Sequence, residues 1–450
     1  MSQLDDAVSR YNKLLEAGPY RDLGWAEALH KRMDHDGLVV GGRPICPFLR
    51  PHFLLRRQYE SLVKTGEALI AAIDRMEQMV LANPALLGRL ELLPAEKMLA
   101  SIDPGYQALE VAARLDTHVR NGSVRFVQYN ADSPTGAGYA DALADLFHDI
   151  PPMKEFRKKY TLSKVGSRKH LLQALLKSYK QFGGVKKPNI AIVEFRPPYH
   201  SGRSEYELFR DFFRQEGYQA EIVSPEQLEY RNRVLRKGNF EINLVYRRLG
   251  VQEFLIRSDL SHPLVQAYRE HSVCVVNSFR SELAHKKAMF GLLTDEALTA
   301  KFPAAERKAI REHVPWTRLV SATKTTYSDE TIDLPEFIVQ NREKLALKPN
   351  DDYSDLHSYF GWETDAAQWE RALKQAMRAP YVVQERVEPV RSVFPLMSFG
   401  HLEFREMQVD VHPHAYLGKV QGCSSWLSAG KSGFSSAAGI APTFILDAKG

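Results

Sequence analysis

Four apolar segments of strand length lie between residues 188 and 276, separated by polar or amphipathic stretches. They are Pro188–Phe195, Tyr218–Val223, Ile242–Tyr246 and Ser272–Val276. Strands that alternate with helices are typical of a parallel sheet whose faces are covered by helices. The sequence therefore predicts an α/β unit in this region, whose ligands bind beyond the carboxyl ends of the strands.

Basic side chains follow two of these predicted strands. Arg196, His200 and Arg203 come after the first strand, and Arg247 and Arg248 come after the third. Because the carboxyl ends of parallel strands meet at one edge of the sheet, we expect a positively charged edge there. Arg203 and Arg247 are therefore candidate contacts to an anionic substrate.

The first hundred residues predict a helical region. Apolar residues recur at helical spacing from Leu54 to Leu81 with charges on the opposite face, and Asn83-Pro84 ends this helix. The preceding loop, Gly41–His52, holds Arg43 and Arg50 among rigid prolines. This loop either caps the helical region or forms a substrate wall in which Arg43 or Arg50 faces an anion.

Oxygen-bearing side chains come together around a short apolar strand that leads into a turn rich in proline and glycine. Asp116 lies upstream of this strand, and Gln128 and Asn130 lie at its end. Such side chains are hard ligands of the type that Mg²⁺ prefers when it also holds phosphates. Arg114 lies beside them and can clamp a phosphoryl group. Without further information, a turn capped by its own Asn and Asp side chains explains the same residues.

This spacing resembles the metal site of circularly permuted ATP-grasp enzymes, the group that includes glutathionylspermidine synthetase. In that family an Arg-x-Asp precedes a Glu-x-Asn, and the acidic and amide residues bind Mg·ATP. Gln128 stands here in place of the glutamate. The resemblance implies that Asp116, Gln128 and Asn130 hold Mg²⁺ and that Arg114 stabilises the transferring phosphoryl group.

Further segments match the nucleotide site of the same family in order along the chain. Lys287 resembles the first phosphate lysine of the family, with Lys286 as a neighbour that resembles it equally in type. Lys348, at the end of an apolar strand before Pro349, resembles the second. The resemblance further implies that Gln384 and Glu385, in Tyr381–Val387, form the hinge over adenine and ribose.

Four places depart from the pattern of the family. Gln128 replaces a glutamate, and Asp351–Ser358 contains no glycine where the family closes a glycine-rich loop over the phosphates. Trp426 replaces an arginine, and Phe434–Gly439 replaces a glycine-rich end. These departures lie at positions that contact phosphate or substrate in the family.

The resemblance implies a mixed α+β and α/β architecture, a circularly permuted ATP-grasp fold with a helical N-terminal region and a flavodoxin-like substrate subdomain. The expected divisions are a helical region (1–100), the metal-site strand and helix (101–165), the flavodoxin-like subdomain (166–280), a lid (281–344) and the C-terminal ATP-grasp core (345–450). Within these divisions we expect a helix over Tyr139–Phe147, another over Asp365–Met377, and a turn at Thr323–Thr326.

Two functions follow from this resemblance. The first is an ATP- and Mg²⁺-dependent ligase that joins a small-molecule or peptide carboxylate to an amine through an acylphosphate. The second is a non-catalytic ATP-grasp relative that binds a peptide or a partner protein, which the four departures favour. The remaining arginine, aspartate, asparagine, lysine and glutamate residues of the site favour the ligase.

Composition excludes other classes of protein. The 60 basic and 55 acidic residues leave a net charge of +5, which is too small to indicate a nucleic-acid surface. The three cysteines lie far apart without metal-binding spacing, and no apolar run approaches the roughly 20 residues of a membrane span. We therefore expect a cytoplasmic protein that binds neither nucleic acid nor membrane.

Other catalytic motifs have little support in the sequence. No P-loop, no Gly-x-Gly-x-x-Gly after a strand and no Gly-x-Ser-x-Gly elbow is present. Asp410, His412 and His414 alternate along a predicted strand, so they share one face and form a weaker candidate metal set. Histidines at this spacing are more often surface residues without a ligand.

Overall fold

The largest sheet combines the last four strands of the chain with four strands that lie between residues 52 and 164. A computed structural model describes residues 3–120, 123–195, 204–351, 357–429 and 438–447. The eight strands run in the order β3-β23-β22-β21-β4-β5, with β20 paired to β21 and β6 paired to β23. Their bounds are β3 (His52–Leu55), β4 (Ala112–Arg120), β5 (Ser123–Asn130), β6 (Leu162–Lys164), β20 (Arg391–Ser398), β21 (His401–Tyr416), β22 (Lys419–Ser428) and β23 (Gly439–Leu446).

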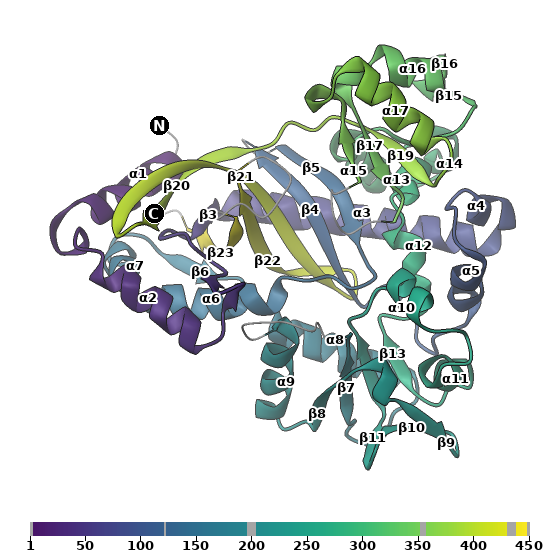
Figure 1. The fold of residues 1–450 in the computed structure, drawn as a ribbon, viewed down its shortest axis with the longest axis horizontal. Helices are drawn as coiled ribbons and strands as arrows, with labels where there is room; N and C mark the ends of the chain where they lie inside the picture. The colour runs from purple at the N-terminus through teal and green to yellow at the C-terminus, as the bar shows by residue number, and fades with distance from the viewer. Residues whose placement is uncertain (1–2, 121–122, 196–203, 352–356, 430–437, 448–450) are drawn as a thin grey trace.

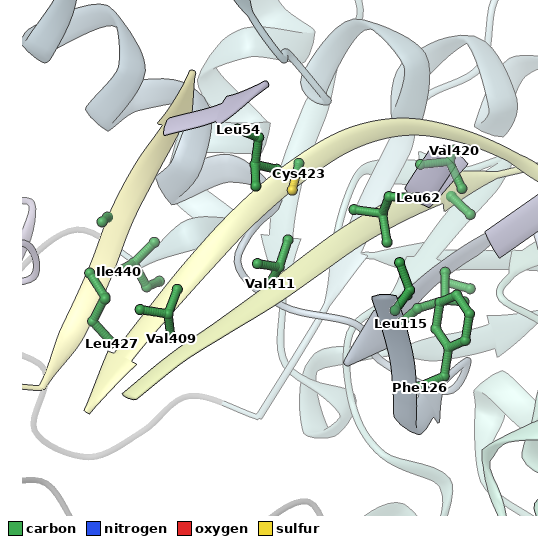
Figure 2. Packing of buried hydrophobic residues seen from close by; sticks show 14 of the residues in the cluster. Leu54, Leu62, Leu115, Phe126, Val409, Val411, Val420, Cys423, Leu427 and Ile440 are labelled. Carbon is green, nitrogen blue, oxygen red and sulfur yellow. The ribbon is translucent and has the colours of Figure 1, made fainter. Parts of the chain in front are cut away.

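The helix α3 (Arg56–Ala82) lies across one face of this sheet (Figure 1). Its apolar stripe is buried and confirms the helix predicted from Leu54 to Leu81, which ends at Asn83 before Pro84. Gly66 faces the sheet, and a Cβ there would make ordinary van der Waals contacts with Val420 at 3.4 Å and Leu115 at 4.0 Å. Figure 2 shows Leu62 of α3 beside these sheet residues in the main hydrophobic core.

Other helices surround the large sheet. Residues 3–101 form α1 (Gln3–Glu16), α2 (Gly24–His35), α3, α4 (Pro84–Gly88) and α5 (Pro94–Ser101), together with the short hairpin β1 (Val39–Val40) and β2 (Arg43–Pro44). The helix α6 (Ala137–Asp149) confirms the prediction over Tyr139–Phe147 and contacts β22 and β23, and α7 (Pro151–Arg157) follows it. Residues 3–101 are therefore mostly helical, with one small hairpin and the strand β3, which joins the large sheet.

The predicted parallel sheet is confirmed. It has the order β13-β12-β7-β8, and all of its pairs are parallel. The strands are β7 (Ile190–Val193), β8 (Ala220–Val223), β12 (Leu244–Arg247) and β13 (Cys274–Val276). Apolar residues from α8 (Arg168–Gln181) and α9 (Glu205–Gln215) cover one face, and those from α10 (Val251–Arg257) and α11 (Pro263–Arg269) cover the other. A small antiparallel sheet of β9 (Glu229–Arg231), β10 (Val234–Lys237) and β11 (Phe240–Ile242) lies beside it.

A third unit is a four-stranded antiparallel sheet in the order β14-β19-β17-β18. Its strands are β14 (Thr317–Leu319), β17 (Leu345–Pro349), β18 (Tyr359–Phe360) and β19 (Tyr381–Glu385). The helices α16 (Leu334–Gln340) and α17 (Ala366–Ala376) bury Trp369 against it, and α17 confirms the predicted helix over Asp365–Met377. The helices α12 (Glu282–His285), α13 (Ala288–Leu293), α14 (Glu296–Thr299) and α15 (Ala304–His313) lead from the parallel sheet to this unit.

The prediction of a turn at Thr323–Thr326 is wrong. These residues enter β15 (Lys324–Tyr327), which pairs with β16 (Glu330–Asp333). The chain turns instead at Ser328 and Asp329, which have φ values of 47° and 68°. Threonine is β-branched and favours strands, whereas Ser and Asp tolerate the left-handed conformation of a tight hairpin turn more readily.

The chain therefore has a mixed α+β fold whose C-terminal third is shared between two sheets. Residues 345–385 belong to the small antiparallel sheet, and residues 391–446 return to the large sheet. Figure 1 shows the small unit above the strands β4 and β5, and the parallel sheet on the opposite side of them. No helix within the described ranges combines the length and the apolar character that crossing a membrane would require.

Candidate functional site

The predicted metal ligands meet on the neighbouring strands β4 and β5. Arg114 pairs with Asn130 in register, and Asp116 pairs with Gln128. Asn130 donates a hydrogen bond from Nδ2 to Asp116 Oδ2 at 2.8 Å, and Gln128 donates from Nε2 to Asn130 Oδ1 at 2.9 Å. Because residues opposite each other on antiparallel strands lie on one face, the structure brings all three together.

Arg114 holds Asp116 from the same strand. Its guanidinium donates from Nε to Oδ1 at 2.7 Å and from Nη2 to Oδ2 at 3.1 Å. The Nη1 group donates to the hydroxyl of Thr135 at 2.9 Å and to its carbonyl at 3.1 Å. Burial by itself would raise the pKa of Asp116, but the nearby Arg114 charge and the hydrogen bonds lower the pKa well below its usual value. Asp116 is therefore ionised at neutral pH.

Histidines surround this carboxylate, and one of them was not predicted. His412 Nε2 lies 3.7 Å from Asp116 Oδ1, and His118 Nδ1 lies 3.2 Å from Asp410 Oδ1. Burial lowers the pKa of both His118 and His412 to about 4, so both rings are neutral at pH 7. His118 is two residues from Asp116 on one strand, and this period-two spacing is the signal that sequence reasoning missed.

The histidine set proposed as a metal site is arranged differently from a ligand cluster. His412 faces Asp116, whereas His414 Nε2 lies 2.9 Å from Ser424 Oγ. Among the described residues, the group of three such side chains whose ligand atoms all lie within 4.8 Å of one another consists of Glu96, Glu282 and Asp351 instead. The ammonium of Lys286 occupies that group of carboxylates.

Lys286 and Lys287 have different environments although they are adjacent. Lys286 Nζ lies 3.0 Å from Glu96 Oε1 and 2.7 Å from Glu282 Oε1, and it donates to Asp351 at 2.5 Å. Burial would lower the pKa of Lys286, but these carboxylates outweigh it and raise the pKa. Lys287 is half-buried and lines a small pocket. The buried lysine is thus bound within the fold, and Lys287 faces the site.

The small pocket lies between the layers that carry the predicted nucleotide residues. Its cavity volume is about 10 Å³, or about 210 Å³ when the space open to solvent is counted, and Gln128, Lys287 and Gln384 are among its lining residues. Lys348 on β17 donates from Nζ to Gln384 Oε1 at 3.0 Å. Gln384 on β19 donates from Nε2 to Thr317 Oγ1 at 3.2 Å and to the Val127 carbonyl at 3.4 Å. Gln384 therefore connects the small sheet to β5.

Glu385 also lies between these layers. Tyr327 donates from its hydroxyl to Glu385 Oε1 at 3.3 Å, and Arg125 Nη2 lies 3.6 Å from Oε2. Tyr327 belongs to the hairpin β15–β16, and Arg125 belongs to β5. The carboxylate is thus held at the junction of three elements, and its contact with a ribose stays a prediction.

The candidate substrate arginines lie in different surroundings. Arg50 is buried, donates to the Val393 carbonyl at 2.9 Å, and stacks 4.2 Å from the centre of the Phe394 ring. Arg247 is buried, forms an ion pair with Asp132, and donates to the Asn277 carbonyl at 3.0 Å. Both side chains support the fold, and their contact with a substrate stays a prediction.

Arg203, the third of these arginines, lies outside the described residues. The same holds for most of two predicted departures, the glycine-poor segment after Asp351 and the segment that ends at Gly439. The other two departures, Gln128 and Trp426, lie in β5 and β22.

Arg43 lines a second and larger pocket on the other side of Arg114. This pocket encloses about 880 Å³, counting space that opens to solvent. Its wall comes from the hairpin β1–β2, the start of α6, and the strands β22 and β23, and it includes Trp426. Thr135, which accepts the hydrogen bonds of Arg114, lies in the wall. Arg114 therefore lies between a carboxylate on one side and this pocket on the other.

The donor set near Asp116 fits a magnesium ion that arrives together with phosphates. Asp116, Gln128 and Asn130 offer a carboxylate and two amide oxygens on one face. Mg²⁺ usually takes one or two carboxylates from the protein and completes its coordination with water and substrate phosphates. Because Arg114 already neutralises Asp116, these residues do not supply enough charge to retain the ion alone.

Comparison with known proteins gives a shared fold. No known family profile and no curated protein matches the chain. A glutathione synthetase-like effector from Globodera pallida, solved in its apo form, is similar with a TM-score of 0.60 at 14% identity. The match covers 96% of this chain and 98% of that protein. A protein from Methylobacillus flagellatus KT, provisionally described as a gamma-glutamylcysteine synthetase, matches with a TM-score of 0.41 and 10% identity over 86% and 87% of the two chains. The chain thus has the fold of a glutathione synthetase-like protein.

Proposed function

We propose that this chain is an ATP-dependent carboxylate–amine ligase with a circularly permuted ATP-grasp fold. The observation that carries the proposal is the pocket between the sheets, where Lys287 and Gln384 face Gln128. Lys348, hydrogen-bonded to Gln384, adds a second cation beside it. Two lysines opposite an oxygen-rich strand pair are suited to polyphosphate.

The order of these residues supports the permuted form of the fold. The oxygen ligands lie in residues 116–130, before the parallel sheet, and the lysines and hinge follow at 287, 348 and 384–385. The two groups meet where Gln384 of β19 donates to the Val127 carbonyl of β5 and where Lys287 lines the pocket beside Gln128. The shared fold with a glutathione synthetase-like protein is consistent with this arrangement.

The proposed reaction has two steps, phosphoryl transfer and amide formation. A substrate carboxylate oxygen attacks the γ-phosphorus of ATP, which forms an acylphosphate and releases ADP. An amine nitrogen then attacks the acyl carbon, which forms an amide, expels phosphate and loses a proton. In this reaction Lys287 and Lys348 neutralise phosphate charge, and Arg114 stabilises the charge that develops on the transferring group.

Asp116, Gln128 and Asn130 would hold the magnesium ion that accompanies ATP. When bound, such an ion neutralises phosphate charge and orients the phosphates. Because Gln128 offers an oxygen without charge, we expect the ion to bind with the nucleotide and not before it. A calorimetric titration with MgCl₂ alone would then give no heat, whereas Mg·ATP would bind.

The test is binding of ATP and of a non-hydrolysable analogue, with and without Mg²⁺, followed by ADP release in the presence of carboxylate and amine mixtures. Lys348→Met is expected to weaken nucleotide binding at least tenfold, because one phosphate cation is lost. Lys374→Met, which removes an exposed lysine from α17, is the matched control. Absence of nucleotide binding at millimolar concentration would overturn the proposal.

One observation favours a second candidate function, a non-catalytic relative that binds a peptide or a partner protein. Asp116 is the single carboxylate of the predicted ligand set, and Arg114 pairs with it through two hydrogen bonds. A site with so little negative charge is poorly suited to phosphoryl transfer, which depends on metal ions. Nucleotide binding without ADP release for any carboxylate and amine pair would support this second function.

A further inference from the structure

The large pocket beside Arg114 has an apolar body and a polar side. Val40, Pro44, Trp426 and Ile440 give it apolar walls, while Thr135 and Arg43 are polar. Trp426 and Ile440 are paired across β22 and β23, so both side chains lie on one face of the sheet. Without the space that is open to solvent, the cavity volume is about 300 Å³, which lies at the lower end of the range of small-molecule sites.

The walls of this pocket are held in place by backbone hydrogen bonds. Ile440 donates from its amide to the Ile45 carbonyl at 3.0 Å, and Ile45 donates to the Leu38 carbonyl at 2.9 Å. These bonds fasten the hairpin β1–β2 and the chain after it to β23. The cavity is therefore formed by fixed elements, and a ligand does not have to order them on binding.

The polar side of the pocket favours an anion. Arg43 is exposed and forms no ion pair with any residue in the described part of the chain. Thr135 accepts hydrogen bonds from Arg114 at its hydroxyl and its carbonyl, which leaves the hydroxyl proton for a ligand. A negatively charged group at this side would meet one cation directly and a second behind the threonine.

We propose that this pocket binds a carboxylate that carries an aromatic or other bulky apolar group, with the carboxylate toward Thr135 and Arg43. The apolar group lies against Trp426 and Ile440. The role of this carboxylate as the substrate that the ligase activates rests on the proposed function. Binding of the carboxylate in the pocket is inferred from the cavity and the charged residues around it alone.

Three small probes test the two parts of this ligand separately. Hydrocinnamate carries a phenyl ring and a carboxylate, propionate lacks the ring, and hydrocinnamamide lacks the charge. In calorimetric titrations without nucleotide we expect hydrocinnamate to bind at least tenfold more tightly than either of the others. Equal binding of propionate would overturn the apolar part, and equal binding of the amide would overturn the anionic part.

A pair of valine variants locates the binding. Val40 lies at the rim of the pocket with 46% of its surface exposed, and Val185 is 94% exposed. We expect Val40→Asp to weaken hydrocinnamate binding at least fivefold by repelling the carboxylate, and Val185→Asp to leave it unchanged. Both positions are exposed, so neither variant disturbs the core. Equal behaviour of the two variants would place the binding elsewhere and overturn the proposal.

Arg43→Gln completes the test, with Arg378→Gln as its control. Arg43 lines the pocket, whereas Arg378 is an exposed residue after α17 in the small unit. Only the first change is expected to weaken hydrocinnamate binding, and an equal effect of both would overturn the anionic part.

The experiments distinguish a failure of the pocket proposal from a failure of the proposed ligase function. Binding of hydrocinnamate without ADP release contradicts the proposed function alone, and ADP release with polar carboxylates only contradicts the pocket alone.

Discussion

Arg114 and Asp116, two residues apart on β4, face the same way and form two hydrogen bonds of 2.7 and 3.1 Å. The pair has two consequences for the site. It keeps Asp116 ionised, and at the same time the positive charge of Arg114 offsets the negative charge that would attract a divalent cation. It also turns the remaining guanidinium nitrogen toward Thr135 and the larger pocket. The proposed nucleotide site and the proposed substrate pocket are therefore connected through one arginine.

Gln128→Glu is expected to strengthen the binding of Mg·ATP. The new carboxylate would lie opposite Asp116 in the strand register and supply the missing negative charge. We expect about a tenfold lower Kd in the presence of Mg²⁺, or about 1.4 kcal/mol, and no gain without it. Gln215→Glu, at the exposed end of α9, adds the same charge elsewhere and is the control. Calorimetry measures both, and a gain that is independent of Mg²⁺ would contradict the ligand assignment.

Lys286→Met and Lys287→Met are expected to affect different properties, the first the stability and the second the nucleotide binding. Removing Lys286 leaves Glu96, Glu282 and Asp351 together without their cation, which costs about 3–5 kcal/mol of unfolding free energy. Removing Lys287 is expected to leave stability nearly unchanged and to weaken nucleotide binding. Urea denaturation and calorimetric titration of both variants measure these effects. A stable Lys286→Met protein would show that the carboxylates in this cluster are protonated.

The buried carboxyl groups of Glu77 and Glu110 predict a dependence of stability on pH. Burial raises the pKa of Glu110 from 4.5 to about 7, and burial together with the Glu110 charge raises the pKa of Glu77 well above its usual value. Between pH 4.5 and 7 the folded state then binds more protons than the unfolded state. The free energy of unfolding should therefore fall as pH rises through this window.

Glu110→Gln tests this linkage, because glutamine keeps the shape and cannot titrate. Denaturation with urea at intervals from pH 5 to pH 8 should show a flatter stability profile for the variant than for the native chain. Glu77 remains in the variant and its burial still raises its pKa, so the slope is reduced and not abolished. Identical slopes for both proteins would mean that these carboxyl groups are not linked to folding.

Gly361 is expected to tolerate no side chain. A Cβ at this position would overlap the Arg342 carbonyl oxygen and lie 2.9 Å from the Leu345 carbonyl oxygen, and backbone atoms cannot rotate away. Gly361→Ala should therefore destabilise the small unit by about 1–3 kcal/mol. Gly88→Ala is the control, because no atom lies within 4 Å of its Cβ position. That change is expected to stabilise α4 by about 0.5–1 kcal/mol. Thermal denaturation measures the melting temperatures of both variants, and equal values for Gly361→Ala and Gly88→Ala would refute the predicted clash at Gly361.

Much of the secondary structure was predictable because local patterns are strong in this chain. The apolar stripe of α3, the four strands of the parallel sheet and the helix α17 follow from periodicity and are observed. The hairpin β15–β16 was misjudged because threonine and serine occur in both strands and turns. Its turn depends on two residues in the left-handed conformation, which no local pattern specifies.

Whether the contacts of a site residue could be predicted depends on how far apart the contacting residues are in the sequence. Asp116, Gln128 and Asn130 belong to one hairpin, so their meeting follows from strand pairing alone. His118 was missed, and its pairing with Asp410 depends on contact between β4 and β21. The sequence favoured Lys287 over its neighbour Lys286, but it could not show that Lys286 is buried, because this depends on carboxylates from α5 and from the residues just after β17.

The sequence by itself determined the helix α3, the parallel α/β unit, and the strand that carries Gln128 and Asn130. Each of these is marked by the pattern of apolar residues within one short segment, so periodicity and turn chemistry suffice to predict it. Only the tertiary structure decided the rest: that the last strands join β4, that Lys286 is buried, and that a pocket opens between Thr135 and Trp426. These features join segments separated by hundreds of residues, and their energies come from burial and pairing of side chains that no local pattern brings together.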